Sequence, residues 1–117
     1  MSRSVLSFVE SNHALTIGPD RQSVRVDGQL VELLATQFRV LELLAGSPGR
    51  IFSRTEILDG IYSQRYAVTP RAVDGHIADL RRRLGPVSSL IETVRGAGYR
   101  FKAVAGSPSP SFQGGVR

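Results

Sequence analysis

Apolar residues recur at two different spacings along this chain, and the changes of spacing divide it into three parts. In the first part, short runs rich in Val, Leu and Ile predict strands over residues 5–9, 14–17, 23–26 and 29–33. Asp27-Gly28 separates the last two runs and is typical of a two-residue hairpin turn, because glycine adopts a positive φ without steric cost. A small antiparallel sheet is therefore expected in this part.

In the second part the apolar residues follow a helical period. Phe38, Leu41 and Leu44 recur at intervals of three, which places them on one face of a helix over residues 35–45. The run of Gly, Ser, Pro and Gly at 46–49 ends this helix, because glycine and proline both interrupt helical hydrogen bonding.

A second helix is predicted to begin near Arg54. Ser53 and Glu56 have the spacing of a capping box, in which the Ser53 hydroxyl accepts from the Glu56 amide while the Glu56 side chain reaches back. This helix is expected to end around Tyr62 and to be followed by a loop over residues 63–68.

The third helix is predicted over residues 70–84. Thr69 supplies a capping hydroxyl, Pro70 occupies a position where no amide hydrogen is needed, and Gly85 follows the last turn. The apolar stripe of this helix recurs at i, i+4, i+7 and i+11 and consists of Val73, Ile77, Leu80 and Leu84.

The third part contains two β-rich runs at 90–94 and 99–104 that flank a glycine turn at 95–98, and so predicts a C-terminal hairpin. The order of sheet, three helices and hairpin indicates an α+β fold of the winged helix-turn-helix type. One domain is expected over residues 1–104. Residues 105–117 are rich in Gly, Ser and Pro, so we expect a disordered tail there.

Charge changes the picture from fold to function. The chain has a net charge of +5, yet residues 1–64 contain six arginines and seven acidic residues. Residues 65–117 contain nine basic and three acidic residues, so the whole positive excess lies in the C-terminal half. Such an asymmetry predicts an anionic partner, and nucleic acid is the commonest one.

Cysteine usage and hydropathy limit the other classes. The chain has no Cys, no secretory leader and no apolar run near the ~18 residues of a membrane span. A cytoplasmic protein without membrane contact is therefore expected.

Little in the sequence supports catalysis. The histidines are His13 and His76, and Asp74 lies two residues before His76, so on a helix the two side chains point apart. The glycine turn at 95–98 lies between strands rather than before a helix, which argues against a phosphate-binding loop. No enzyme activity, metal or cofactor is expected.

The outward face of the third helix is unusual because its centre is nearly bare. At 100° per residue, the positions opposite the apolar stripe are Arg71, Gly75, Ala78 and Arg82, with Arg81 and Arg83 on the flanks. A bare centre between arginines would allow close approach to the DNA major groove. A solvated face with an incidental glycine is the alternative, although a glycine inside a helix costs about 1 kcal/mol relative to alanine.

Two further residues leave alternatives open. Asp79 is either an ion-pair partner of Arg82 or Arg83, which is the preferred interpretation, or an acceptor for a cytosine amino group. Arg95, in the turn of the hairpin, is either a cation that enters a narrow minor groove or an ordinary surface arginine.

Three segments resemble one known family. FRVLELLAGSPGRIFSRTEIL (38–58), RAVDGHIADLRRRL (71–84) and IETVRGAGYRF (91–101) are similar to the DNA-binding effector domain of OmpR/PhoB-type response regulators of two-component systems. The resemblance covers residues 15–102. It implies a four-stranded N-terminal sheet, three helices, a C-terminal wing and a role in bacterial transcription regulation.

The resemblance also implies roles for individual residues. By position, the residues that would contact phosphates are Arg71, His76, Arg81 and Thr93. Gly75 and Asp79 would face bases, and Arg95 would enter the minor groove. We add Arg82 and Tyr62 to the DNA-binding set; Tyr62 stands where a Trp is common. It further implies head-to-tail dimers on direct repeats and contact with RNA polymerase through the loop Ser63–Val68.

Several positions depart from the family pattern. Gly75 replaces a residue that is usually large and apolar, Asp79 one that is often basic, and Leu34 and Gln37 stand where a Thr cap and its Glu are usual. These departures make any inherited base preference doubtful. Such proteins also carry a receiver domain, for which residues 1–14 are too short.

The sequence therefore predicts sequence-specific binding to double-stranded DNA, with a recognition helix over 70–84 in the major groove and a wing over 90–103 in the minor groove. The alternative is a winged helix that contacts proteins and binds DNA weakly or non-specifically. Asp79 favours that alternative slightly, and the arginines of the C-terminal half argue against it. RNA binding is disfavoured because no exposed aromatic platform for stacking is evident.

Overall fold

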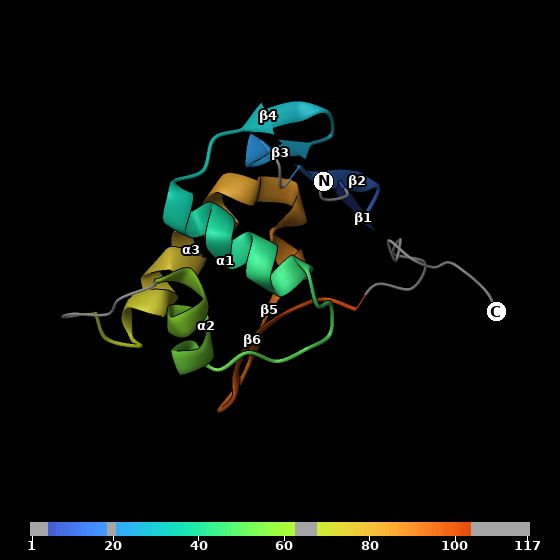
Figure 1. The fold of residues 1–117 in the computed structure, drawn as a ribbon. Helices are drawn as coiled ribbons and strands as arrows, with labels where there is room; N and C mark the ends of the chain where they lie inside the picture. Colours follow the sequence, from blue (N-terminus) through green and yellow to red (C-terminus); the bar gives the residue numbers. More distant parts are fainter. Residues whose placement is uncertain (1–4, 19–20, 63–67, 104–117) are drawn as a thin grey trace.

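The chain folds into an antiparallel sheet, a layer of three helices and a C-terminal hairpin (Figure 1). In the computed structural model, the described residues are 5–18, 21–62 and 68–103. The predicted tail at 105–117 and most of the predicted loop at 63–68 lie outside the described residues.

The N-terminal sheet has four strands in the order β1-β2-β3-β4, all antiparallel to their neighbours. The strands are β1 (Leu6–Glu10), β2 (His13–Gly18), β3 (Ser23–Val26) and β4 (Gln29–Val31), each within one or two residues of its predicted bounds. Alternate residues face the helices, as the period of a strand requires, and the buried ones are Phe8, Leu15, Ile17, Val24 and Val26.

The turn between β3 and β4 has the predicted conformation. Asp27 and Gly28 have φ values of 54° and 82°, which is the two-residue turn that follows the twist of a hairpin. The Asp27 carboxylate also accepts a hydrogen bond from the Ala14 amide at 2.8 Å, which links the turn to β2.

Helices α1 (Ala35–Ala45) and α2 (Arg54–Ile61) begin as predicted. In α2 the capping box is complete, with Ser53 Oγ accepting from the Glu56 amide at 3.0 Å and Glu56 Oε1 accepting from the Ser53 amide at 2.8 Å. In α1 the N-cap residue is Leu34, whose side chain has no hydrogen-bond acceptor. Only the returning half is made there, with Gln37 Oε1 accepting from the Leu34 amide at 3.0 Å.

Helix α3 (Ala72–Leu84) begins two residues later than predicted. The amides of Ala72, Val73 and Asp74 donate to carbonyls three residues earlier, so the chain from Thr69 enters the helix through a tighter turn than an α-helix has. The 3₁₀-helix η2 (Gly85–Leu90) was not predicted; it follows α3 directly and buries Val87 and Leu90.

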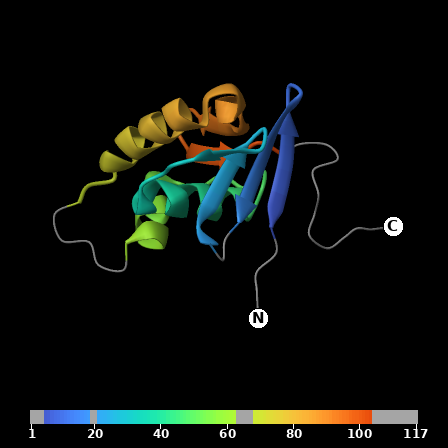
Figure 2. The same cartoon turned by 90° about the horizontal axis from the view of Figure 1, so that it is seen from above.

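The hairpin consists of β5 (Ile91–Val94) and β6 (Gly98–Phe101) and is shorter than predicted. Its second strand, β6, also pairs with the segment between α1 and α2, because Phe52 and Tyr99 exchange both backbone hydrogen bonds, at 2.8 and 2.9 Å. The sheet lies above α1 in Figure 1, and the turn of the hairpin projects below the helices. Figure 2 shows the sheet from above, and η2, at the end of α3, contacts β1 and β2.

Two glycines in the same hairpin turn give a matched test of this arrangement. A Cβ at Gly98 would lie 2.0 Å from the Phe52 carbonyl oxygen, whereas a Cβ at Gly96 would meet nothing within 4 Å, and both residues have positive φ. Gly96→Ala should therefore cost only the strain of a left-handed residue, about 1–2 kcal/mol.

Gly98→Ala should cost more than that, because it must break the pairing of Phe52 with Tyr99 as well. Urea unfolding of the two variants beside the unmodified chain measures the difference. Equal losses at the two positions would mean that the contact with Phe52 does not constrain the hairpin.

Candidate nucleic-acid interface

The two faces of α3 differ as predicted. Its apolar stripe is buried to 1% exposure or less at every position, while Arg71, Gly75, Ala78 and Arg82 are exposed on the opposite side. A Cβ at Gly75 would meet nothing within 4 Å. No neighbour within the described fold therefore requires a glycine there, and the bare centre belongs to the outer surface of the helix.

Asp79 is held by three side chains. It pairs with both Arg82 and Arg83, in agreement with the preferred prediction, and Arg83 Nε lies 3.1 Å from Asp79 Oδ2. Gln37 Nε2 of α1 also donates to Asp79 Oδ2, and this contact was not predicted. Partial desolvation raises the pKa of Asp79, but hydrogen bonds from Arg83 and Arg82 outweigh it and hold the pKa below its ordinary value.

Arg81 joins α3 to the hairpin. Its Nη2 donates to the Ile91 carbonyl at 2.7 Å and to Thr93 Oγ1 at 2.9 Å, and its guanidinium lies 5.8 Å from the centre of the Tyr99 ring. Thr93 accepts in this contact, so its own hydroxyl hydrogen remains available to an acceptor outside the protein. These two predicted phosphate contacts are therefore neighbours.

Asp74 connects α2, α3 and the hairpin. Its Oδ1 accepts from Arg54 Nε at 2.8 Å and from the Tyr99 hydroxyl at 2.5 Å. The hydrogen bond from Arg54 and then that from Tyr99 lower the pKa of Asp74. Burial, followed by the bond to Asp74, raises the pKa of Tyr99.

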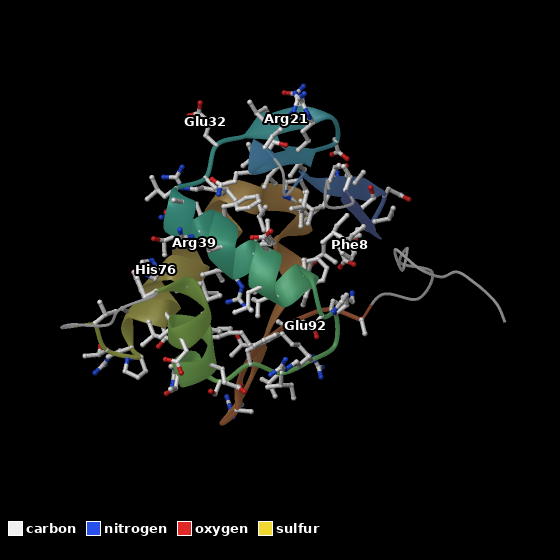
Figure 3. The ribbon with its side chains drawn as sticks, viewed as in Figure 1. Phe8, Arg21, Glu32, Arg39, His76 and Glu92 are labelled. Carbon is white, nitrogen blue, oxygen red and sulfur yellow. The ribbon has the colours of Figure 1, made fainter. Side chains whose placement is uncertain are left out.

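His76 and Tyr62 meet where α2 ends beside α3. The Tyr62 hydroxyl lies 3.1 Å from His76 Nε2, and both side chains are half-buried. In Figure 3 His76 is labelled near the end of α2. Arg39 of α1 donates to the carbonyl of Ile61, the last residue of α2, at 3.0 Å, and so closes that helix end.

A groove runs between the hairpin turn and the starts of α2 and α3. Arg95, Thr93 and the glycines of the turn line one side of it, and Ser53, Arg54 and Pro70 line the other. A second hollow adjoins it, lined by Arg54, Pro70, Arg71 and Asp74. Arginines from three separate elements therefore lie along connected depressions of the surface.

Arg54 and Gln37 belong to this surface and its support but were not predicted to, whereas Arg83 was predicted on the flank of the third helix and as a possible partner of Asp79. The capping box located Arg54 at the start of a helix, but nothing in the local sequence showed that this start faces the hairpin. Gln37 and Asp79 are 42 residues apart, and no local signal joins them.

Other kinds of site are not evident in the described part of the chain. Over residues 5–18, 21–62 and 68–103 no group of three or more potential ligand side chains has the arrangement of a metal site. No helix among them has the length and apolarity needed to cross a bilayer.

Comparison with known proteins gives a consistent family. Residues 28–101 match the family described as "Transcriptional regulatory protein, C terminal". The chain is 43% identical over 88 residues to the phosphate regulon transcriptional regulatory protein PhoB of Rhizobium meliloti, covering 72% of this chain and 39% of that protein. It is 38% identical over 89 residues to the transcriptional regulatory protein CpxR of Escherichia coli, covering 74% of this chain and 38% of that protein.

Solved structures agree with the sequence comparison. The DNA-binding domain of CpxR from E. coli has a TM-score of 0.71 and 33% identity, covering 87% of this chain and all of that one. The DNA-binding domain of Klebsiella pneumoniae RstA, in complex with the RstA box, has a TM-score of 0.72 and 32% identity, covering 86% of this chain and 98% of that one. The chain spans about two fifths of the length of the curated relatives.

The contacts of Asp74 generate a pH prediction. Its pKa is lower in the folded chain than the roughly 3.9 of an unfolded chain. The stabilisation is therefore complete above that unfolded value and is lost as the pH falls through the folded value. Asp74→Asn should lower the free energy of unfolding at pH 7. The difference in this free energy between the variant and the unmodified chain should shrink as the pH falls from about 5 to about 3.

Urea unfolding across this range measures the difference, and Tyr99→Phe is the matched control. This variant removes the hydroxyl that donates to Asp74 and keeps the aromatic ring. Its loss of unfolding free energy should therefore depend on pH in the same direction, but less strongly. A difference for Asp74→Asn that stays constant with pH would contradict the assignment.

Proposed function

The chain belongs to the family of C-terminal DNA-binding domains of OmpR/PhoB-type transcriptional regulators, and we propose that it binds double-stranded DNA sequence-specifically to regulate transcription. The family consists of transcriptional regulators and not of enzymes. The observation that carries the proposal is the exposed, nearly bare face of α3, which has Arg71 at one end and Arg82 at the other.

In the proposed complex the recognition helix, residues 70–84, enters the major groove with Gly75 and Ala78 toward the base edges. The buried stripe fixes the rotation of α3, so the outward face is the one that approaches the DNA. Small side chains in the middle allow the helix backbone to come close, and arginines around them meet phosphates. The phosphate contacts we propose are Arg71, His76, Arg81 and Thr93, with Tyr62 beside His76.

The wing, residues 90–103, is proposed to place Arg95 in the minor groove. Arg95 is exposed at the turn, and the groove it lines continues to the start of α3. A narrow minor groove has an enhanced negative potential that attracts an inserted arginine. Two similar solved structures, the RstA DNA-binding domain in complex with the RstA box and the AdeR DNA-binding domain in complex with an intercistronic region, support DNA as the partner.

The other partners are proposed from the family. We expect head-to-tail dimers on direct repeats, contact with RNA polymerase through the loop at 63–68, and a cytoplasmic location in a bacterium. The alternative function, a winged helix that contacts proteins, is favoured slightly by the acidic Asp79. That support is weak, because two arginines compensate the Asp79 charge in the structure.

Selection from random duplex DNA with the purified chain tests the proposal. We expect a repeated half-site to be enriched. The logarithm of the affinity for this half-site should fall linearly with the logarithm of the salt concentration, with a slope of about −0.9 for each neutralised phosphate. Should no sequence be enriched, and should all binding disappear at moderate salt, the proposal of sequence-specific binding is wrong.

Arg95→Ala tests the wing. Binding should weaken roughly tenfold at half-sites with A·T-rich flanks and less at G·C-rich flanks, because the minor groove is narrower in A·T tracts. Arg21→Ala, at the exposed sheet end labelled in Figure 3, removes the same charge far from the hairpin and should leave this flank dependence unchanged. Equal losses on all flanks for Arg95→Ala would exclude insertion in the minor groove.

A further inference from the structure

The carboxylate of Asp79 is unusually well held for a side chain on a DNA-facing helix. Its Oδ2 accepts from Gln37 Nε2 and from Arg83 Nε, and its Oδ1 accepts from Arg82 Nη2. Its side chain is 23% exposed, so it lies between the core and the surface. A carboxylate in this position does not project outward as a free negative charge.

Gln37 holds this arrangement from inside the protein. Apart from tyrosine, it is the one polar or charged side chain that is buried among the residues that the structure describes, at 2% exposure. Its oxygen accepts from the Leu34 amide at the start of α1, and its nitrogen donates to Asp79. Both ends of the amide are therefore used, which fixes its orientation and the position of the Asp79 carboxylate.

The two arginines that bind Asp79 point in different directions. Arg83 also donates from Nη1 to the Glu32 carbonyl at 3.0 Å, which directs its guanidinium toward the segment between β4 and α1. Arg82 is 70% exposed and lies on the outward stripe with Gly75 and Ala78. Of these two arginines, Arg82 is the one that is bound to Asp79 through Nη2 and has most of its side chain exposed.

An arginine held in this way suits a base edge better than a phosphate. Its charge is already compensated by Asp79, so it gains less from a second anion, whereas its directional donors remain. Guanine presents two acceptors, O6 and N7, to a bidentate arginine in the major groove. A guanidinium that is ordered before binding also loses less side-chain entropy when it binds.

We propose that Asp79 is a positioning residue that presents Arg82 to a guanine in the major groove, and that Gln37 holds Asp79 in place from the core. This proposal rests on the proposed function, because it assigns a base preference to the same helix face. It replaces the contact of Asp79 with a cytosine amino group, since the carboxylate oxygens already accept three hydrogen bonds. Arg82 becomes a specificity-determining residue.

Asp79→Asn is the first test. It removes the charge that holds Arg82 but preserves size and most of the hydrogen-bonding capacity. The preference for guanine at one position of the selected half-site should fall by about tenfold or more. Affinity for unrelated DNA should rise and depend more steeply on salt, because Arg82 and Arg83 become available to phosphates.

These opposite changes separate the proposal from simpler explanations. If Asp79 only repelled DNA, Asp79→Asn would strengthen binding to every sequence equally and leave base preference intact. If Asp79 only stabilised the fold, specific and non-specific binding would both weaken. Either result overturns the proposal, and thermal unfolding of each variant shows whether it is folded.

Two arginine variants give a matched pair. Arg82→Lys keeps the charge but lacks the planar fork, so it should lose the same guanine preference as Asp79→Asn. Arg83→Lys should keep that preference, because Arg83 is directed toward Glu32 and not outward. If Arg83→Lys lost the guanine preference and Arg82→Lys kept it, Arg83 and not Arg82 would be the residue that contacts guanine.

A donor–acceptor exchange tests the role of Gln37. Gln37→Glu places a buried carboxylate against Asp79 and should lower stability. In the double variant Gln37→Glu with Asp79→Asn, the hydrogen bond between α1 and α3 is restored in the reverse direction and the repulsion between two carboxylates is removed, so stability should recover in part. The guanine preference should not recover, because Arg82 still lacks its carboxylate; recovery of both would show a purely structural role.

Failure of the proposal is distinguishable from failure of the proposed function. If the unmodified chain selects no sequence, both the proposed function and the positioning role of Asp79 are wrong. An unmodified chain that selects a half-site, together with Asp79→Asn and Arg82→Lys variants of identical base preference, removes only the positioning role.

Discussion

Burial of the apolar stripe of α3 is the constraint on which the rest of the molecule depends. Val73, Ile77, Leu80 and Leu84 are each exposed by 1% or less, so the helix can rotate in neither direction without bringing apolar surface into water. Each such side chain contributes about 1.5–3 kcal/mol when fully buried. The rotation of α3, and with it the identity of the outward face, is therefore set by the core and not by the polar residues on the surface.

Polar contacts then fix the position of the helix along its length. Near its start, Asp74 binds Arg54 of α2 and Tyr99 of the hairpin. In its middle, Asp79 binds Gln37 of α1. Near its end, Arg81 binds the Ile91 carbonyl of β5. The hairpin is also joined to the sheet, because the rings of Phe101 and Phe8 lie 4.5 Å apart. The wing and the recognition helix are thus held relative to each other by contacts that local sequence does not reveal.

The sequence predicted what is local and missed what is distant. Helix starts and strand runs followed from capping residues and from periodicity, and both α1 and the capping box of α2 agree with the prediction. The start of α3 was predicted too early, because Thr69 and Pro70 favour a helix start but the first hydrogen bonds close a tighter turn. Helix η2 was missed because Gly85 and Pro86 are breakers by propensity, while burial of Val87 and Leu90 decides the outcome.

The same distinction applies to charge. The C-terminal half has an excess of positive residues, yet many of these cations already have partners within the protein. Arg83 binds Asp79 at 3.1 Å, Arg100 binds Glu92 at 2.8 Å, and Lys102 binds Glu10 at 3.0 Å. A cation that is already paired gains less from a phosphate, because its partner partly compensates its charge. The number of basic residues therefore overstates the electrostatic attraction to DNA, and on our proposal the discrimination between sequences depends on a few arginines whose direction the fold controls.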